Sequence, residues 1–205
     1  MKVLILNGSP HENGNTFTAL HEMETVFAEQ GIETELIHVG KEAIRGCIDC
    51  RTCHQTGKCV FSDIVNSIAD KFADADGLVV GTPVYYASAN ATLDALLTRL
   101  FFSTPFDKTM KVGAAVAAAR RGGLTATFDQ LNKYFAISGM PIAAGCYWNG
   151  IHGMNADDAK QDGEGLYMMR TLARNMSFLM KSIALGKETY GLPAKEERIV
   201  TNFIR

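Results

Sequence analysis

Short apolar runs alternate with helix-like patterns along most of this chain, and this alternation restricts the fold more than any other feature. The runs are typical of buried parallel strands because they are mostly continuous and rich in β-branched residues. Most segments between them carry apolar residues at helical spacing. The pattern predicts an α/β fold, a doubly wound sheet of five parallel strands with helices on both faces. The predicted strands lie at residues 3–6, 33–39, 77–81, 111–119 and 141–146.

The length and charge of the chain narrow the possibilities further. Its 205 residues predict a single domain over 1–205, with a cysteine-bearing loop at 46–60 and a helical C-terminal extension at 157–186. Twenty basic and 22 acidic residues leave a net charge of −2, so we expect no nucleic-acid partner and no membrane surface. No apolar run approaches the ~20 residues of a membrane span. The first strand begins directly after Met1-Lys2 without room for a signal peptide, so the expected location is cytoplasmic.

The loop after the first predicted strand has the composition of an anion-binding loop. Residues 8–16 read Gly-Ser-Pro-His-Glu-Asn-Gly-Asn-Thr and lead into a helix. The helix N-terminus carries partial positive charge, and Ser9, Asn15 and Thr16 add side-chain donors. Neither Gly-x-x-x-x-Gly-Lys-Ser/Thr nor Gly-x-Gly-x-x-Gly is present, so a single terminal phosphate, such as that of FMN, fits better than a triphosphate or pyrophosphate. The alternative is an ordinary turn in which Asn15 caps the helix.

Two further loops at predicted strand ends have unusual chemistry. Residues 82–88, Thr-Pro-Val-Tyr-Tyr-Ala-Ser, hold adjacent tyrosines that cannot both face the core, so one can form a wall for a planar ring. Residues 119–123 read Ala-Arg-Arg-Gly-Gly. The glycines permit the backbone to approach a ligand closely, and an arginine could bind the negative charge of a reduced flavin or a phosphate of a nicotinamide cofactor. The alternatives are half-buried tyrosines and a solvated arginine pair. Because ligands of such sheets bind at the carboxyl ends of the strands, we expect the three loops to converge.

Four of the five cysteines lie close together as Cys47-x-x-Cys50-x-x-Cys53-x-x-x-x-x-Cys59. Two consecutive C-x-x-C steps bring three thiols into one compact turn, an arrangement that iron–sulfur clusters favour. Structural zinc sites usually join two separate pairs across a longer loop. The four cysteines are therefore candidate metal ligands, and the alternatives are redox-switching thiols, a zinc site or an empty motif.

Packing accounts for two other features. Cys146 falls in the predicted fifth strand and is expected to be buried. The last helical pattern is rich in methionine, and we expect its methionines to pack in the core rather than against a partner subunit. These methionines are Met168, Met169, Met176 and Met180.

Three of these motifs together resemble the NADPH-dependent FMN reductase family, which has a flavodoxin-like fold. The resemblance rests on residues 8–10 with 14–16, on residues 81–86 and on residues 121–123, and it extends to about residue 146. It implies non-covalently bound FMN, with the phosphate on the first loop and the ring between the other two. The predicted cofactor-binding residues are Ser9, His11, Gly14, Asn15, Thr16, Pro83, Val84, Tyr85, Tyr86, Arg120, Arg121, Gly122 and Gly123. The family more often has arginine in place of His11 and lysine in place of Asp94.

The cysteine spacing resembles that of the iron–sulfur flavoproteins, a branch of the same family that binds a [4Fe-4S] cluster. The resemblance implies an FMN-dependent oxidoreductase that passes electrons from NAD(P)H or a reduced protein donor to a quinone, a flavin or an iron–sulfur centre. No catalytic acid, base or nucleophile is predicted, and Tyr86 and Arg121 are the main candidates to contribute to the reaction. A homodimer or homotetramer is also implied. We expect the cysteine loop to lie near the flavin, across a subunit interface.

Two other classes of function are compatible with the sequence. One is a non-enzymatic, flavodoxin-like electron carrier, although such carriers are usually strongly acidic and this chain is nearly neutral. The other is a thiol-based redox sensor in which the four clustered cysteines report oxidation. Reduction of bound flavin by NADPH alone distinguishes the enzyme from both.

Overall fold

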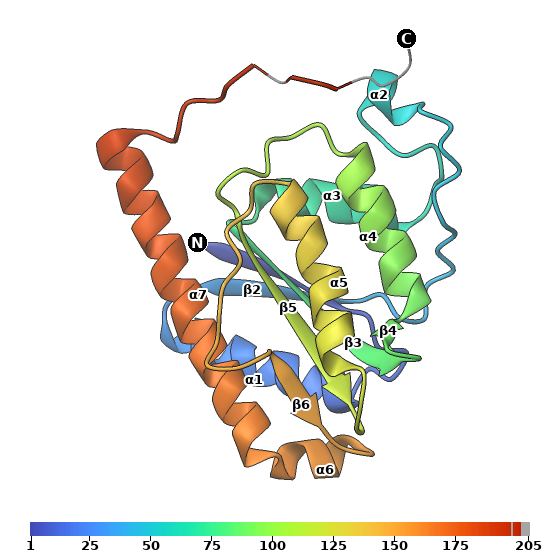
Figure 1. Cartoon of the computed structure of the whole chain (residues 1–205), viewed down its shortest axis with the longest axis vertical. Coiled ribbons are helices and arrows are strands. Elements are labelled where there is room, and N and C mark those ends of the chain that lie inside the picture. Colours follow the sequence, from blue (N-terminus) through green and yellow to red (C-terminus); the bar gives the residue numbers. More distant parts are fainter. Residues whose placement is uncertain (198, 202–205) are drawn as a thin grey trace.

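The computed structural model, which describes residues 1–197 and 199–201, contains a central parallel sheet covered by helices on both faces (Figure 1). The sheet order is β2-β1-β3-β5-β6, and a short strand, β4, pairs antiparallel with the end of β3. Numbered along the chain, the five parallel strands follow the order 2-1-3-4-5 of flavodoxin-like folds. The predicted fold class is confirmed. The strands are β1 (Lys2–Asn7), β2 (Glu33–His38), β3 (Gly77–Tyr85), β4 (Ser88–Ala89), β5 (Val112–Ala119) and β6 (Gly150–His152).

Two hydrophobic cores lie on opposite faces of this sheet because successive strand residues point to opposite sides. Ile5 of β1 packs into the core on the α1 and α7 side, whereas Leu4 and Leu6 pack into the core on the α3, α4 and α5 side. The methionines of the last helix are buried in the first core, as predicted. The helices are α1 (Asn15–Glu29), α2 (Cys53–Thr56), α3 (Ile64–Asp74), α4 (Ala91–Ser103), α5 (Leu124–Ile137), α6 (Ala156–Gln161) and α7 (Gly163–Tyr190).

The predicted fifth strand at 141–146 is wrong. That segment makes only an isolated bridge between Ile142 and Gly113, and the fifth strand is β6, which pairs with Ala117–Ala119 at the end of β5. Pro141 cannot donate to a ladder and Gly145 weakens strand structure, so the segment leaves the sheet. Cys146 is consequently exposed rather than buried.

Two other element boundaries differ from the sequence prediction. β3 continues to Tyr85 instead of ending at Gly81, and Pro83 is tolerated because β1 pairs with β3 only as far as Gly81. The C-terminal extension consists of two helices that meet at Asp162, whose side chain accepts a hydrogen bond from the Gly165 N–H and caps α7. None of the helices in the described residues is long and apolar enough to cross a membrane.

Candidate functional site

A cleft of about 1030 Å³ lies at the carboxyl ends of the parallel strands, at the lower edge of the sheet in Figure 1. Ligands of doubly wound sheets bind at this edge. The cleft brings together most of the predicted cofactor residues, from all three loops. Those that line it are Ser9, His11, Gly14, Asn15, Thr16, Pro83, Val84, Tyr85 and Arg120.

The first loop is folded by its own backbone and by the end of β1. Ser9 is buried, its N–H donates to Asn7 Oδ1 at 2.9 Å, and its Oγ accepts from the His11 N–H at 3.1 Å. Gly14 is the N-cap of α1 and no side chain caps the helix. The alternative in which Asn15 caps the helix is therefore wrong, because Asn15 is its first residue and donates to the Gly153 carbonyl at 2.6 Å. The uncapped N-terminus suits an anionic group of a ligand.

Gly40, just after β2, packs against the backbone of this loop, a contact that no local sequence pattern indicates. A Cβ atom at Gly40 would lie 2.2 Å from the Ser9 carbonyl carbon and 2.5 Å from the Pro10 nitrogen. Both contacts are with backbone, which cannot move aside without displacing the loop. The shape of the first loop therefore depends on the absence of a side chain at position 40.

Asn90 joins the first loop to the second. Its Nδ2 donates to the Gly8 carbonyl at 2.6 Å, and its backbone N–H donates to Thr82 Oγ1 at 2.9 Å. Its Oδ1 accepts from the Thr92 N–H at 3.2 Å and caps the N-terminus of α4. One buried residue, through its side chain and its backbone N–H, thus fixes two cleft loops and a helix in a single arrangement.

The second loop forms a tight hairpin between β3 and β4. Tyr86 and Ala87 have φ values of 52° and 58°, the left-handed pair that a two-residue type I′ turn requires. Tyr85 lines the cleft and is 43% exposed, whereas Tyr86 is fully exposed at the turn. Non-glycine residues are strained in the left-handed region of φ, so the hairpin needs contacts from another element to hold this conformation. Gln130 of α5 supplies it by accepting from the Ala89 N–H at 2.9 Å.

The third loop divides between lining the cleft and supporting the hairpin. Both arginines are exposed, but Arg120 lines the cleft and Arg121 does not. Gly123 has a φ of 90°, and a Cβ there would lie 2.8 Å from the Ala87 Cα. The absence of a side chain at Gly123 therefore allows the loop to pack against the hairpin. Within the described residues, the predicted positions that do not line the cleft are Tyr86, Arg121, Gly122 and Gly123.

The segment after β6 also lines the cleft and was missed from the sequence. Gly153, Met154 and Asn155 line the cleft, and the Gly153 carbonyl accepts a hydrogen bond from Asn15 of the first loop. Lys41 adds a cation that pairs with Glu12 at 3.5 Å. Residues that directly follow a parallel strand are candidates for lining the cleft. Residues 153–155 follow β6, but the sequence predicts the fifth strand at 141–146, so they are not among the predicted site residues.

All four clustered cysteines line a second, small cavity of about 20 Å³ beside α4. Cys47 and Cys50 are exposed, whereas Cys53 and Cys59 are half-buried. A hydrogen bond from Thr52 lowers the pKa of the Cys50 thiol, and burial raises the pKa of the Cys53 thiol. No group of three or more cysteine, histidine or carboxylate side chains among residues 1–197 and 199–201 is placed to hold a metal ion.

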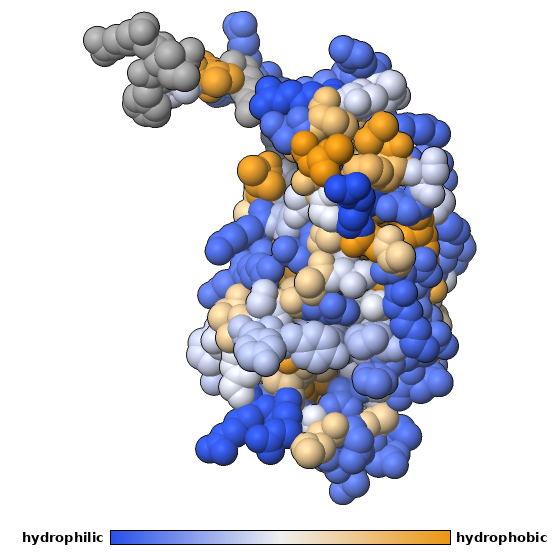
Figure 2. All heavy atoms as spheres, turned by 90° about the vertical axis from the view of Figure 1, so that its right-hand side faces the viewer, coloured by the Kyte–Doolittle hydropathy of each residue, from blue (hydrophilic) through white to orange (hydrophobic). Residues whose placement is uncertain are grey.

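The cysteine cavity is separated from the cleft of the same chain by much of α4. Asn90 at the start of α4 contacts the cleft loops, whereas Arg99 and Phe102 near its end line the cysteine cavity. At 1.5 Å per residue, Arg99 lies about 14 Å along the helix axis from Asn90. Figure 2 shows apolar side chains gathered on the upper part of the face that it presents. In the lining of the cysteine cavity, Ile48, Val60 and Phe102 are each about half exposed.

Comparison with known proteins agrees with this architecture. The model of the NADPH-dependent FMN reductase family matches residues 1–153. An iron–sulfur flavoprotein of Methanocaldococcus jannaschii is 36% identical over 194 residues, which is 89% of this chain and 99% of that protein. An iron–sulfur flavoprotein of Methanosarcina thermophila is 28% identical over 192 residues, with 92% and 100% covered.

A solved structure shows the same fold at low sequence identity. RosB, with bound 8-demethyl-8-formylriboflavin-5′-phosphate, superposes with a TM-score of 0.71 at 18% identity, covering 100% of this chain and 94% of its own. The resemblance first drawn from three loop motifs is thus confirmed by a family match that spans the first loop, the hairpin and the third loop. The chain belongs to the NADPH-dependent FMN reductase family, and its similar relatives include proteins named iron–sulfur flavoproteins.

Proposed function

We propose that this protein is an FMN-dependent oxidoreductase that accepts electrons from NAD(P)H or a reduced protein donor and passes them to a quinone, a flavin or an iron–sulfur centre. The observation that carries the proposal is that the first loop (residues 8–16), Tyr85 of the second loop and Arg120 of the third loop line one cleft. Family membership supports it independently. FMN supplies the hydride and electron chemistry, and the chain supplies binding, orientation and charge.

The cleft fits the two chemically different ends of FMN. Its volume of about 1030 Å³ is at the upper end of the range for small-molecule sites. The uncapped N-terminus of α1, with the side chains of Ser9 and Thr16, suits the phosphate. The strand end at Pro83, Val84 and Tyr85 offers an apolar and aromatic surface to the ring. The polar and apolar parts of the cleft are therefore arranged as this cofactor requires.

Arg120 is the residue we assign to the charge that develops in the cleft. A reduced flavin and the phosphates of a nicotinamide cofactor are both anionic, and a guanidinium can bind either. Lys41 is the other strong cation in the cleft lining, but it already pairs with Glu12. Arg120 therefore replaces Arg121 as the candidate from this loop, because only Arg120 lines the cleft.

We also propose that the four cysteines hold a [4Fe-4S] cluster. They line one cavity. Two consecutive Cys-x-x-Cys steps with a nearby fourth cysteine are a spacing that iron–sulfur clusters favour, whereas structural zinc sites usually join two separate pairs across a longer loop. Relatives named iron–sulfur flavoproteins cover nearly the whole chain, which supports the same assignment.

The position of the cysteines bears on how the two centres would communicate. Because much of α4 separates them within one chain, we propose that the cluster of one subunit serves the flavin of another in a homodimer or homotetramer. The exposed apolar side chains of Ile48, Val60 and Phe102 around the cysteine loop suit such a contact. Free cysteines with exposed side chains also suit the reducing cytoplasm.

Two adjacent arginines provide a matched test of the proposed enzyme. The variants Arg120→Ala and Arg121→Ala each remove one exposed guanidinium from the same loop. We expect Arg120→Ala to lower kcat/KM for flavin reduction by NADPH about tenfold or more, the size of a lost charge-assisted contact, and Arg121→Ala to change it less than about twofold. Anaerobic stopped-flow absorbance measures both. Equal effects would contradict the role of Arg120, and a flavin that NADPH and NADH both fail to reduce would favour the electron carrier.

A further inference from the structure

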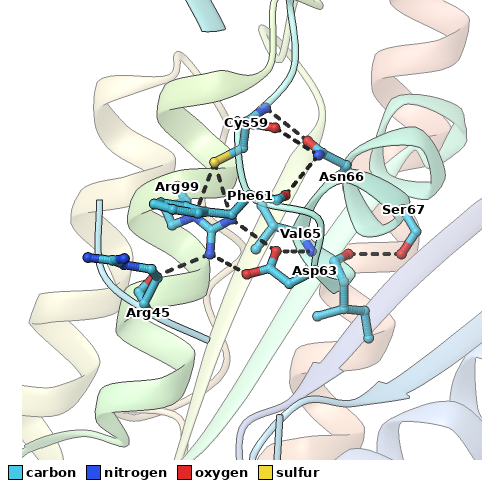
Figure 3. Close-up of polar contacts among 9 residues, drawn as sticks. Arg45, Cys59, Phe61, Asp63, Val65, Asn66, Ser67 and Arg99 are labelled. Atoms are coloured by element: carbon cyan, nitrogen blue, oxygen red, sulfur yellow. Dashed lines mark hydrogen bonds and ion pairs between the residues drawn. The ribbon is translucent and has the colours of Figure 1, made fainter. Parts of the chain in front are cut away.

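Arg99 makes an unusual set of contacts for a side chain that is only 1% exposed. Its Nε and its Nη2 both donate to the sulfur of Cys59, each at 3.2 Å. Figure 3 shows the guanidinium lying between that sulfur and the carboxylate of Asp63. Arg99 comes from α4 and Cys59 from the end of the cysteine loop, so the contact joins the loop to the helical core.

The orientation of the guanidinium is fixed by its other contacts. Nη1 donates to Asp63 Oδ2 at 2.5 Å and to the Arg45 carbonyl at 3.2 Å, and Nη2 donates to Asp63 Oδ1 at 2.9 Å. With the two bonds to Cys59, these contacts use all the N–H donors that a guanidinium has. The Arg99 guanidinium also lies over the ring of Phe61, 4.9 Å from its centroid. Two N–H groups are thereby held toward the sulfur.

The backbone of Cys59 is held as firmly as its sulfur. Asn66 of α3 accepts from the Cys59 N–H at 2.9 Å and donates to the Cys59 carbonyl at 3.0 Å. The loop that carries the other three cysteines contains left-handed residues instead, with φ values of 49° at Asp49 and 58° at Arg51. Of the four cysteines, Cys59 is the one whose backbone and sulfur are both hydrogen-bonded to side chains of α3 and α4.

Charge explains why two donors point at one sulfur. A neutral thiol is a weak acceptor, and the hydrogen bonds are strong only when the sulfur carries negative charge, as a metal-bound thiolate does. The ion pair with Asp63 keeps the guanidinium charged in its buried position.

We propose that Arg99 is a positioning residue for the iron–sulfur cluster, fixing the Cys59 sulfur as its anchoring ligand and raising the reduction potential of the cluster through two N–H···S hydrogen bonds. Hydrogen bonds to ligand sulfurs stabilise the reduced cluster more than the oxidised one, because the reduced cluster carries one more negative charge. This inference rests on the proposed [4Fe-4S] cluster.

Arg99→Lys and Arg45→Lys form a matched pair of variants. Lysine keeps the positive charge but cannot donate twice to the sulfur while also pairing with both oxygens of Asp63. Arg45 lies over the same Phe61 ring, 4.7 Å from its centroid, but only its backbone carbonyl takes part in the network around Cys59. The second variant therefore controls for loss of a guanidinium near Phe61.

The experiment uses anaerobically reconstituted full-length protein, with iron, sulfide and flavin assayed on each sample. A redox titration followed by electron paramagnetic resonance gives the midpoint potential of the cluster. We expect a more negative potential in Arg99→Lys, loss of iron to a chelator about 10-fold faster or more, and unchanged flavin content. We expect Arg45→Lys to match the wild type in all three measurements.

A second measurement needs no variant that might misfold. In wild-type protein labelled with ¹⁵N-arginine, pulsed paramagnetic resonance of the reduced cluster should detect a ¹⁵N coupling from a guanidinium donor. Iron-loaded wild type without this coupling, or equal potentials in both folded variants, would overturn the role of Arg99 and leave the cluster standing. Wild type that takes up neither iron nor sulfide would instead overturn the cluster, and the inference with it, without affecting flavin reduction by NADPH.

Discussion

The cleft at the strand ends and the cysteine cavity lie at opposite ends of α4 and are built in different ways. The cleft is formed by strand ends, and its loops are tied to one another, for example by the hydrogen bond from the Gly8 N–H to the Gly81 carbonyl at 2.8 Å. The cysteine cavity is formed by an irregular loop in which only Cys59 is firmly anchored. The comparison shows that the ends of paired strands position several loops of a site together. The position of an irregular loop depends instead on a few hydrogen bonds from buried side chains.

This difference predicts how each site responds to substitutions. The cleft should lose ligand affinity when backbone packing is disturbed, since its shape is set by close approach between loops. The cysteine cavity should tolerate changes in the exposed part of its loop but not in Arg99, Asp63 or Asn66, which hold Cys59 in place. Each prediction below tests one side of this contrast.

The largest effect is expected from Gly40→Ala. A methyl group there would lie 2.2 Å from the Ser9 backbone, so the first loop must shift and the phosphate site with it. We expect FMN affinity to fall about 100-fold or more, the size of two or three lost charge-assisted hydrogen bonds. Isothermal titration with FMN measures this. Gly163→Ala is the control, because a Cβ at Gly163 meets nothing within 4 Å, and similar affinities in the two variants would show that Gly40 does not shape the loop.

A smaller effect is expected within the cysteine loop itself. Cys47 and Cys50 are exposed, whereas Cys59 is half-buried and its sulfur accepts two hydrogen bonds from the Arg99 guanidinium. In protein prepared without iron, we expect iodoacetamide to modify Cys47 and Cys50 about tenfold faster than Cys59, because reactivity follows access to the sulfur. Mass spectrometry of quenched samples gives the three rates, and denatured protein serves as the control. Equal rates in the folded protein would show that Cys59 is no better anchored than the rest.

The smallest effect is expected from Tyr134→Phe, which tests the helices that join the two sites. The Tyr134 hydroxyl bonds to Asp94 Oδ1 at 2.8 Å and to Thr98 Oγ1 at 2.8 Å. Burial, with the hydrogen bond to Asp94, raises the pKa of Tyr134 from 10.0 to about 12. We expect the variant to lose about 1 kcal/mol of unfolding free energy at neutral pH.

The pH dependence of this contribution has a defined sign. Because the pKa is raised in the folded state, the contribution of Tyr134 is present below pH 10 and is lost as the pH rises from 10 to about 12. Wild type and Tyr134→Phe should therefore converge in stability across that window when both are unfolded with urea. A constant difference between them would contradict the assigned pKa.

The sequence predicted what local patterns determine. Alternating apolar runs were enough for the parallel sheet, and the composition of residues 8–16 was enough for the first loop of the cleft. The fifth strand was misplaced because residues 141–146 are as apolar as a strand, and only pairing with β5 distinguishes them from Gly150–His152.

Local sequence patterns do not predict contacts between residues that are far apart in the sequence. Nothing near Gly40 indicates that it packs on Ser9, and Arg99 is separated from Cys59 by 40 residues. On the sequence alone, Arg99 reads as a polar position in an amphipathic helix. Its role as an anchor depends on tertiary structure, as does the choice between Arg120 and Arg121 for the cleft.

The central claim is that the cleft at the strand ends binds FMN, and the visible spectrum of the anaerobically purified protein tests it most directly, with flavin, iron and sulfide assayed on the same sample. We predict flavin bands that correspond to one FMN per chain, over the broad absorbance of an iron–sulfur cluster, and bleaching of the flavin bands by NADPH. Flavin bands without iron would contradict the proposed iron–sulfur cluster but would support FMN binding in the cleft. Protein that binds no flavin even after FMN is added would contradict the account.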